Sequence, residues 1–242
     1  METLILSIAF FFAALLYSSV GHAGASAYLA AMAIVGVSAS TMRPTALAMN
    51  ILVSTLVIYR FNKVGLVDWK RIVPFIAGSI PAAFIGGSLS LSTDAYNTLV
   101  GLILLIIAFQ LFFKANLVER QRFKLTLPIA FMAGAVLGLL SGLTGTGGGI
   151  FLTPLLIFAG WASAKQAAGL SAVFILANSV SGLLGNYSSF QYLPPQLPIW
   201  LIVVAIGALI GSYFGANKLP NPALKRALAL VLVIASFKLL FL

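Results

Sequence analysis

Cysteine is absent from this chain of 242 residues, and only four residues are acidic. Without cysteine there can be no disulfide, no thiolate metal site and no cysteine nucleophile. Charged residues make up 7% of the chain and hydrophobic residues 61%, whereas soluble domains are about 25% charged. So few charges cannot solvate a globular surface of this size. The composition therefore predicts a protein that is solvated mainly by lipid.

The acidic residues lie at the N-terminus or between apolar segments, and none lies within such a segment. They are Glu2, Asp68, Asp94 and Glu119. This placement excludes an intramembrane carboxylate site for Na⁺, a carboxylate proton relay and hydrolysis by paired acids, and it argues against a cationic substrate. The chain has one histidine and no phosphate-binding loop of the type G-x-x-x-x-G-K-[ST]. We expect no enzyme, no ATP hydrolysis, no metal site and no cofactor.

Basic residues give the chain a net charge of +10, which raises the alternative of a nucleic-acid partner. Most of them gather between apolar runs, within residues 60–71, 114–124 and 218–226, while residues 91–94 and 186–196 contain neither lysine nor arginine. This is the pattern of cytoplasmic loops in membrane proteins. We expect the lipid bilayer of the plasma (inner) membrane as a partner and no nucleic acid.

Ten apolar segments fill the chain, five in each half. They lie near residues 4–19, 26–37, 45–59, 72–89, 96–113, 127–140, 150–160, 167–184, 197–214 and 223–241. If the basic loops face the cytoplasm, corresponding segments of the two halves run in opposite directions. We expect an all-α polytopic membrane protein, a five-plus-five inverted repeat of eight long helices and two short segments, with both termini outside. The first repeat covers residues 1–115, a basic cytoplasmic linker 116–125 and the second repeat 126–242.

Glycines interrupt the apolar sequence in the second half, where Thr144, Gly145, Thr146, Gly147, Gly148 and Gly149 follow one another. Glycine costs a helix about 1 kcal/mol per residue relative to alanine, so this cluster predicts a helix break. Within a membrane, a break is tolerated where it lines a polar cavity, and the N-terminus of the following half-helix attracts anions. The alternative is that the glycines only permit close helix packing.

A second break is expected at the corresponding place in the first half, around Ser19, Gly21, His22, Gly24 and Ser26. His22 is a candidate proton carrier or anion partner, and a structural role is equally open. Asn50 and Asn178 lie inside apolar segments, where an amide without a partner is costly. Three roles are open for each: a hydrogen bond between helices, a cap on the broken backbone, or contact with a ligand. Arg43 attracts an anion or extends to the interface at a helix start. These residues and the glycine cluster form our predicted substrate site.

The chain resembles the TauE/SafE family of sulfite-exporter-like permeases. The resemblance rests on Gly142-x-x-Gly145-x-Gly147-Gly-Gly149 with Pro154, on Ala168-Gly-Leu-Ser171, and on Arg43-Pro-Thr-Ala-Leu-Ala-Met-Asn50. It implies a plasma-membrane transporter for sulfite or an organosulfonate such as sulfoacetate. The first half departs from the pattern, because Gly21-His-Ala-Gly24-Ala-Ser26 stands in place of a glycine triplet.

The residues themselves argue for a small anion as substrate, moved by alternating access between the two breaks. A passive anion channel and a non-transporting membrane scaffold or assembly factor are the alternatives. The sequence leaves open the direction of transport, the coupling ion and the oligomeric state, with a homodimer among the options.

Overall fold

A computed structural model describes residues 2–113, 125–217, 232–234 and 236–241, and this part of the chain contains helices and no strand. The helices are α1 (Glu2–Ser18), α2 (Ala25–Val35), α3 (Ala39–Lys63), α4 (Trp69–Ser88), α5 (Thr93–Phe113), α6 (Leu127–Thr144), α7 (Gly149–Phe158), α8 (Ala164–Gly185) and α9 (Leu197–Asn217), with a short 3₁₀ helix, η1 (Tyr187–Tyr192). Residues 232–234 and 236–241 are also helical. Among the described helices, α3, α4, α6, α8 and α9 are long and apolar enough to cross a membrane. The predicted all-α polytopic fold is confirmed.

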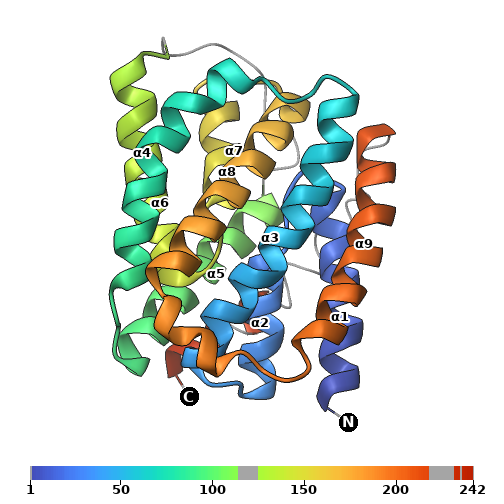
Figure 1. Cartoon of the computed structure of the whole chain (residues 1–242), viewed down its shortest axis with the longest axis vertical. Helices are drawn as coiled ribbons and strands as arrows, with labels where there is room; N and C mark the ends of the chain where they lie inside the picture. Colours follow the sequence, from blue (N-terminus) through green and yellow to red (C-terminus); the bar gives the residue numbers. More distant parts are fainter. Residues whose placement is uncertain (1, 114–124, 218–231, 235, 242) are drawn as a thin grey trace.

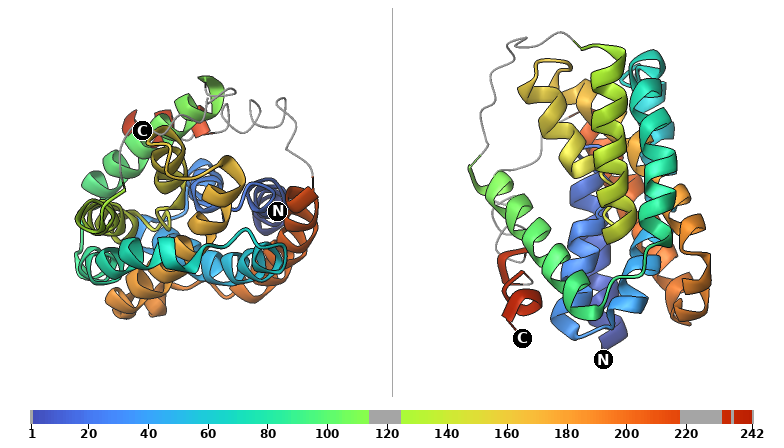
Figure 2. Two further views of the ribbon diagram at one scale, coloured as in Figure 1. Left: turned by 90° about the horizontal axis from the view of Figure 1, so that it is seen from above. Right: turned by 90° about the vertical axis from the view of Figure 1, so that its left-hand side faces the viewer.

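Both expected breaks are present, because α1 ends at Ser18 before α2 begins at Ala25, and α6 ends at Thr144 before α7 begins at Gly149. Helix α1 rises from one end of the molecule to about mid-height and α2 returns to that same end (Figure 1). Helix α6 enters from the opposite end and α7 returns there (Figure 2). Each pair is therefore a hairpin whose glycine-containing tip lies inside the molecule.

The helices form two flanking pairs around a centre (Figure 1). Helix α4 packs on α6 along one flank, α1 packs on α9 along the other, and α3 and α8 cross between them. In each pair, the residue numbers of contacting residues increase together along both helices. The two helices of each pair are therefore parallel. The α4–α6 pair runs towards the end at which the α1–α9 pair starts, so the two pairs run in opposite directions (Figure 1). Opposite directions are compatible with the five-plus-five inverted repeat, which stays a prediction.

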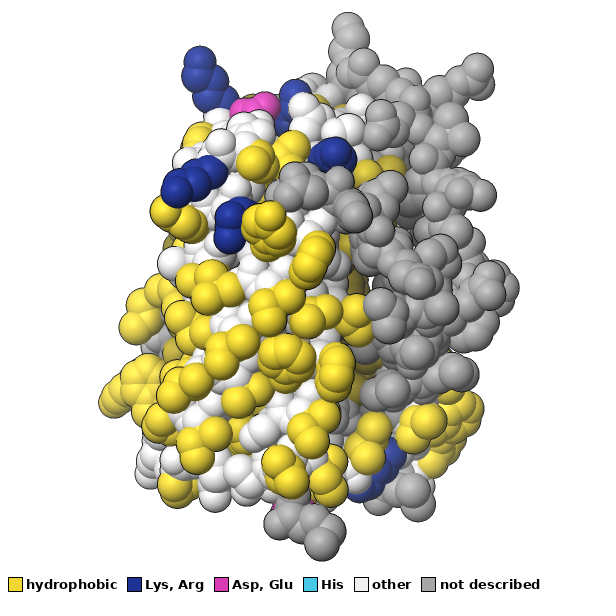
Figure 3. Space-filling model, turned by 90° about the vertical axis from the view of Figure 1, so that its right-hand side faces the viewer, with side chains coloured by type: hydrophobic (Ala, Val, Ile, Leu, Met, Phe, Trp, Pro, Cys, Tyr) yellow, Lys and Arg dark blue, Asp and Glu magenta, His cyan; other side chains and the backbone are white. Residues whose placement is uncertain are grey.

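The face drawn in Figure 3 is apolar over its middle, and most of its basic side chains lie at one end. Large apolar side chains are exposed along the outer faces, including Phe12 of α1, Met132 of α6 and Ile202 of α9. The basic end carries Arg60, Lys63, Lys70, Arg71 and Lys165, around the α3–α4 and α7–α8 connections. The opposite connections, residues 36–38, 89–92 and 186–196, contain neither lysine nor arginine. Residues 116–124 of the expected basic linker, 116–125, and the bases at 218–226 lie outside the described residues.

Helix starts are set by side chains that satisfy free backbone N–H groups. Asp68 accepts a hydrogen bond from the backbone N–H of Arg71 at the start of α4, and Ser163 and Gln166 form a capping box at the start of α8. Helix α3 begins at Ala39, earlier than the start near residue 45 that we predicted. Pro44 is therefore inside the helix, where its missing N–H leaves the carbonyl oxygen of Ser40 without its usual helical donor. Arg43 therefore lies within α3.

Glycines at four-residue spacing let both flanking pairs approach backbone to backbone. A methyl group added at Gly134, Gly138 or Gly142 of α6 would overlap the carbonyl oxygen of Phe75, Ser79 or Ala83 of α4. On the other flank, Gly207, Gly211 and Gly215 of α9 face the carbonyl oxygens of Phe11, Leu15 and Ser19 in the same way. Close helix packing, which we gave as the alternative role for the glycines of residues 145–149, is thus the role of these other glycines on α6 and α9.

Replacing Gly138 by alanine should destabilise the α4–α6 pair by about 1–3 kcal/mol, because the added methyl overpacks a backbone contact. The readout is a lower apparent melting temperature of the purified protein in detergent. Gly182→Ala is the matched control, since Gly182 is also helical and the nearest atom to its added Cβ lies 3.3 Å away. Equal melting temperatures for G138A and G182A would contradict the close packing.

Candidate functional site

The second break takes its shape from three glycines in the left-handed region of backbone conformation. Gly145, Gly147 and Gly148 have φ angles of 82°, 76° and 74°. Side-chain-bearing residues rarely adopt such angles, which explains why the stretch is built from glycine. Gly145 ends α6 by donating its N–H to the carbonyl oxygen of Ser141 at 2.8 Å, and Gly148 is the N-cap of α7. The first N–H groups of α7 have no acceptor within the helix and carry its positive dipole end.

Polar side chains with unpaired atoms surround this break. An added Cβ at Gly147 would lie 2.8 Å from Asn50 Nδ2 and 3.3 Å from Ser179 Oγ, and one at Gly148 would lie 3.2 Å from Ser141 Cβ and 3.3 Å from Asn178 Nδ2. We call these four side chains the polar ring: Asn50 of α3, Ser141 of α6, and Asn178 and Ser179 of α8. All four are fully buried.

No polar side-chain atom of the ring has a hydrogen-bond partner among the described residues. Both oxygen and nitrogen of the Asn50 and Asn178 amides are unpaired, so neither amide bonds between helices or caps the broken backbone there. A buried amide without a partner costs about 1–3 kcal/mol by protein mutational data, and two amides and two hydroxyls meet at one place. Such a cluster suits a small ligand that accepts hydrogen bonds from several directions.

The first break meets the second through His22. Its Nε2 lies 3.2 Å from the carbonyl oxygen of Gly149 and 3.1 Å from Thr153 Oγ1, both in α7. Its Nδ1 lies 3.0 Å from the carbonyl oxygen of Val20. Thr153 Oγ1 is also 2.6 Å from Ser171 Oγ of α8. His22 is thus the contact between the tips of the two hairpins.

The other predicted residues of the first break shape it and lie away from the polar ring. Gly21 and Gly24 have φ angles of 80° and 106°, and Gly24 is the N-cap of α2. An added Cβ at Gly21 would clash with Ala168 of α8, which accounts for the glycine. Ser26 Oγ is 2.7 Å from the Tyr17 hydroxyl, and Ser19 Oγ donates to the carbonyl oxygen of Leu16 at 2.6 Å.

Arg43 is buried and directed at the end of α4. Its guanidinium donates to the carbonyl oxygens of Leu89 at 3.1 Å, Gly86 at 2.8 Å and Gly87 at 2.5 Å. These are carbonyls at the C-terminal end of a helix, where a positive charge is favourable. Its Nε has no partner among the described residues. The structure thus gives Arg43 a helix-capping contact, and its predicted contact with an anion stays a prediction.

The threonines of the second break form a separate hydrogen-bonded group. Thr144 Oγ1 donates to the carbonyl oxygen of Leu140 at 2.7 Å and lies 3.0 Å from Thr146 Oγ1. The Tyr96 hydroxyl of α5 donates to the carbonyl oxygen of Thr144 at 3.1 Å. These contacts fix the end of α6 just before the glycines.

Sequence reasoning missed several residues that complete the site. Ser141 and Ser179 belong to the polar ring, and Thr153 and Ser171 extend the contact from His22. Their signal is weak because single serines and threonines are common in membrane helices. Both serines of the polar ring lie close in sequence to predicted site residues. Ser141 lies three residues before Thr144, and Ser179 directly follows Asn178.

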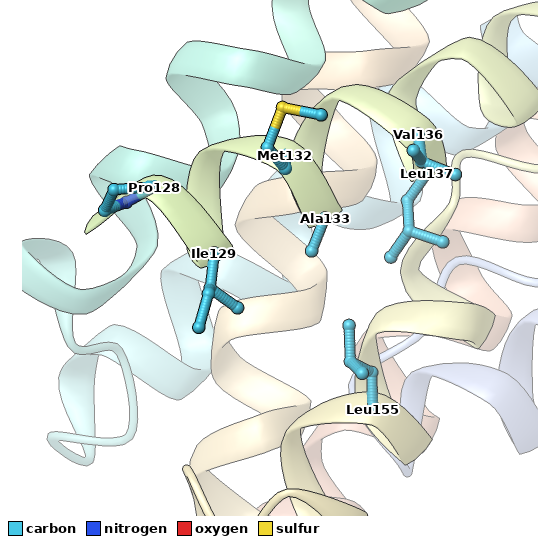
Figure 4. A pocket seen from close by; sticks show the side chains of 7 residues that line it. All are labelled: Pro128, Ile129, Met132, Ala133, Val136, Leu137 and Leu155. Carbon is cyan, nitrogen blue, oxygen red and sulfur yellow. The ribbon is translucent and has the colours of Figure 1, made fainter. Parts of the chain in front are cut away.

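A groove of about 530 Å³ on the outer surface is unlike the polar ring (Figure 4). It runs between α6 and α7, and apolar side chains line it: Pro128, Ile129, Met132, Ala133, Val136, Leu137 and Leu155. Nothing in this lining would bind an anion. Among the described residues there is also no group of three or more histidine or acidic side chains that could hold a metal ion.

Comparison with known proteins identifies relatives along nearly the whole chain. The model of the family described as "Sulfite exporter TauE/SafE" matches residues 6–239. The probable membrane transporter protein y4hK of Sinorhizobium fredii is 42% identical over 246 residues, covering 99% of each chain. The probable membrane transporter protein MamO of Paramagnetospirillum magneticum is 28% identical over 254 residues, covering 86% of this chain and 40% of MamO. No solved structure shows a significant match. The names of this family and of both relatives describe membrane transport and not an enzymatic reaction.

Replacing Asn178 by leucine should leave the protein equally stable or raise its stability by about 1 kcal/mol, because an unpaired buried amide is replaced by an apolar side chain of the same branching. The measurement is again the apparent melting temperature in detergent. Ser181→Ala is the matched control on the same helix, since Ser181 Oγ donates to the carbonyl oxygen of Ile80 at 2.5 Å and its loss should lower stability. A marked fall for N178L would mean that Asn178 has a structural partner.

Proposed function

The chain belongs to the sulfite exporter TauE/SafE family and is a multi-pass membrane transporter, and from this premise we propose that it is a secondary transporter of sulfite or an organosulfonate such as sulfoacetate. The observation that carries the proposal is the polar ring, with its four unpaired side chains around Gly147 and Gly148. We place the protein in the plasma membrane, as the family resemblance implies.

The donors of the ring fit a compact oxyanion. The amide nitrogens of Asn50 and Asn178 approach the break from α3 and α8, and the hydroxyls of Ser141 and Ser179 add two further donors from α6 and α8. The N-terminus of α7 supplies backbone N–H groups and a partial positive charge. A sulfite or sulfonate group offers three oxygens around one sulfur, so it can accept from several of these directions at once.

The packing suggests how the two sides of the membrane are reached in turn. The α4–α6 pair joins the first half of the chain to the second, and so does the α1–α9 pair. We infer that these two glycine-locked pairs move as rigid units and that α3 and α8 form the interface between them. Because α3 and α8 carry the asparagines and the tip of each hairpin belongs to one flank, rocking one flank against the other would open the ring to either side. This proposed motion assumes that the chain is a five-plus-five inverted repeat.

Replacing Gly148 by valine should abolish transport while the protein still inserts into the membrane. Gly148 has a φ of 74°, and an added Cβ would lie 2.8 Å from Phe174 Cε1 and near Asn178 and Ser141, inside the ring. We expect wild-type protein in liposomes to show saturable counterflow of labelled sulfoacetate or sulfite, and G148V to show at most about 1% of that rate, because overpacking and backbone strain of ~3 kcal/mol correspond to about a hundredfold.

Gly65→Val is the matched control, because Gly65 has a φ of 71° but no atom lies within 4 Å of its added Cβ. It carries a similar backbone strain in the α3–α4 connection, far from the ring, and should transport. Thermal-shift measurements with sulfite, sulfate, thiosulfate, sulfoacetate, taurine and carboxylates would then rank the substrates. Wild-type rates for G148V would contradict the site, and electrodiffusive currents without counterflow would indicate a channel.

A further inference from the structure

We propose that the anion crosses the membrane together with a proton and that His22 carries this proton. The inference rests on the proposed function, since it concerns the coupling of the same site. It follows from the charge balance of the polar ring and from the hydrogen-bond geometry of His22.

The polar ring has donors but no free positive charge. Arg43 is the buried cation of the described helices, and its guanidinium is bound to three carbonyl oxygens of the α4 terminus. The described lysines and the remaining described arginines lie at the two ends of the molecule, at Arg60, Lys63, Lys70, Arg71, Lys165 and Lys238. Burying an uncompensated anion costs several kcal/mol even with hydrogen bonds. A proton bound beside the ring would neutralise much of the charge of the anion.

Both ring nitrogens of His22 face carbonyl oxygens, Val20 for Nδ1 and Gly149 for Nε2. A neutral imidazole has one N–H, so it can donate to only one of these acceptors. Its other nitrogen is then an acceptor, and the Thr153 hydroxyl at 3.1 Å can donate to it. The doubly protonated ring can donate to both carbonyls at once. The surroundings of His22 therefore accommodate two protonation states without moving the ring.

The hydroxyls beside His22 can reorient with its charge. In the neutral state Thr153 donates to Nε2 and Ser171 donates to Thr153, across a distance of 2.6 Å. In the protonated state Nε2–H donates to Gly149 and the Thr153 hydroxyl turns to donate to Ser171. Protonation thus adds a charge-assisted bond to Gly149, the first residue of α7, and stabilises the arrangement in which its N-terminus faces the anion.

The neighbouring elements leave His22 as the group that changes charge near neutral pH. Tyr17 of α1 packs edge-on to it with ring centroids 6.4 Å apart, and its hydroxyl lies 2.7 Å from Ser26. Tyr28 of α2 donates to the carbonyl oxygen of Ala23 at 2.5 Å. Phenols ionise near pH 10, far from neutrality. On α7 there is no titratable residue, and on α8 the one titratable residue is Lys165 at the exposed basic end; on α3, Arg43 is directed at α4.

The test uses purified protein in liposomes with the membrane potential held at zero by potassium and valinomycin, and labelled sulfoacetate as the probe. With one proton per anion, an outside-acid gradient of one pH unit should accumulate the anion about tenfold inside, since that gradient and a tenfold ratio both correspond to ~1.4 kcal/mol. A trapped pH dye should report about one proton entering per sulfoacetate. Protein-free liposomes correct for leakage.

His22→Gln keeps hydrogen-bonding groups but cannot carry the proton. We expect H22Q to show slower counterflow and no accumulation under the same gradient, while Tyr28→Phe, which alters the same break without touching the His22 contacts, accumulates about tenfold. Tenfold accumulation by H22Q, or wild-type counterflow with no proton entry, would overturn the coupling and leave the proposed function standing. The dye measurement on wild-type protein decides this even where H22Q fails to fold. Absence of wild-type counterflow for both sulfoacetate and sulfite would instead refute the proposed function, and with it the coupling.

Discussion

Every backbone N–H and C=O within a bilayer needs a partner, and the rest of this structure depends on that constraint. The chain interrupts two helices at mid-height, at residues 19–24 and 145–148, and so leaves helix ends inside the protein. Those ends are tolerable only because other helices surround them completely. The glycines supply the left-handed turns, and α3, α8 and the facing hairpin cover the exposed groups. Most of the buried side-chain atoms that remain unpaired in the described residues lie around Gly147 and Gly148, where a ligand can supply the missing partners.

The parts that hold the breaks differ from the parts that line them. Glycines on α4, α6 and α9 bring helices into backbone contact and make two stiff flanks. Arg43 ties α3 to the end of α4, and Lys238 donates to the carbonyl oxygen of Ile34 at the end of α2. These contacts hold neighbouring helices together, although Arg43 Nε itself has no partner among the described residues. The unsatisfied groups are concentrated on α3, α6 and α8 beside Gly147 and Gly148. This division between paired and unpaired groups separates the frame of the protein from the candidate site.

The sequence predicted the breaks because glycine clusters in an apolar run have few other physical explanations. It also identified Asn50 and Asn178, since an amide is conspicuous inside an apolar helix. It did not reveal that α2 and α7 return to the end from which they came, because hydropathy carries no direction for a short segment. The target of Arg43 was also hidden, since an arginine near a helix start looks the same whether it faces an anion or a neighbouring helix terminus. Ser141, Thr153, Ser171 and Ser179 were missed because hydroxyls in membrane helices usually bond to their own backbone.

The most direct test of the account is an electron cryomicroscopy structure of the protein bound to sulfoacetate in a lipid nanodisc. The account predicts density for the anion beside Gly147 and Gly148, with its oxygens within hydrogen-bond distance of the amide nitrogens of Asn50 and Asn178. Amides of Asn50 and Asn178 that are paired with protein groups, with the anion bound elsewhere, would contradict it.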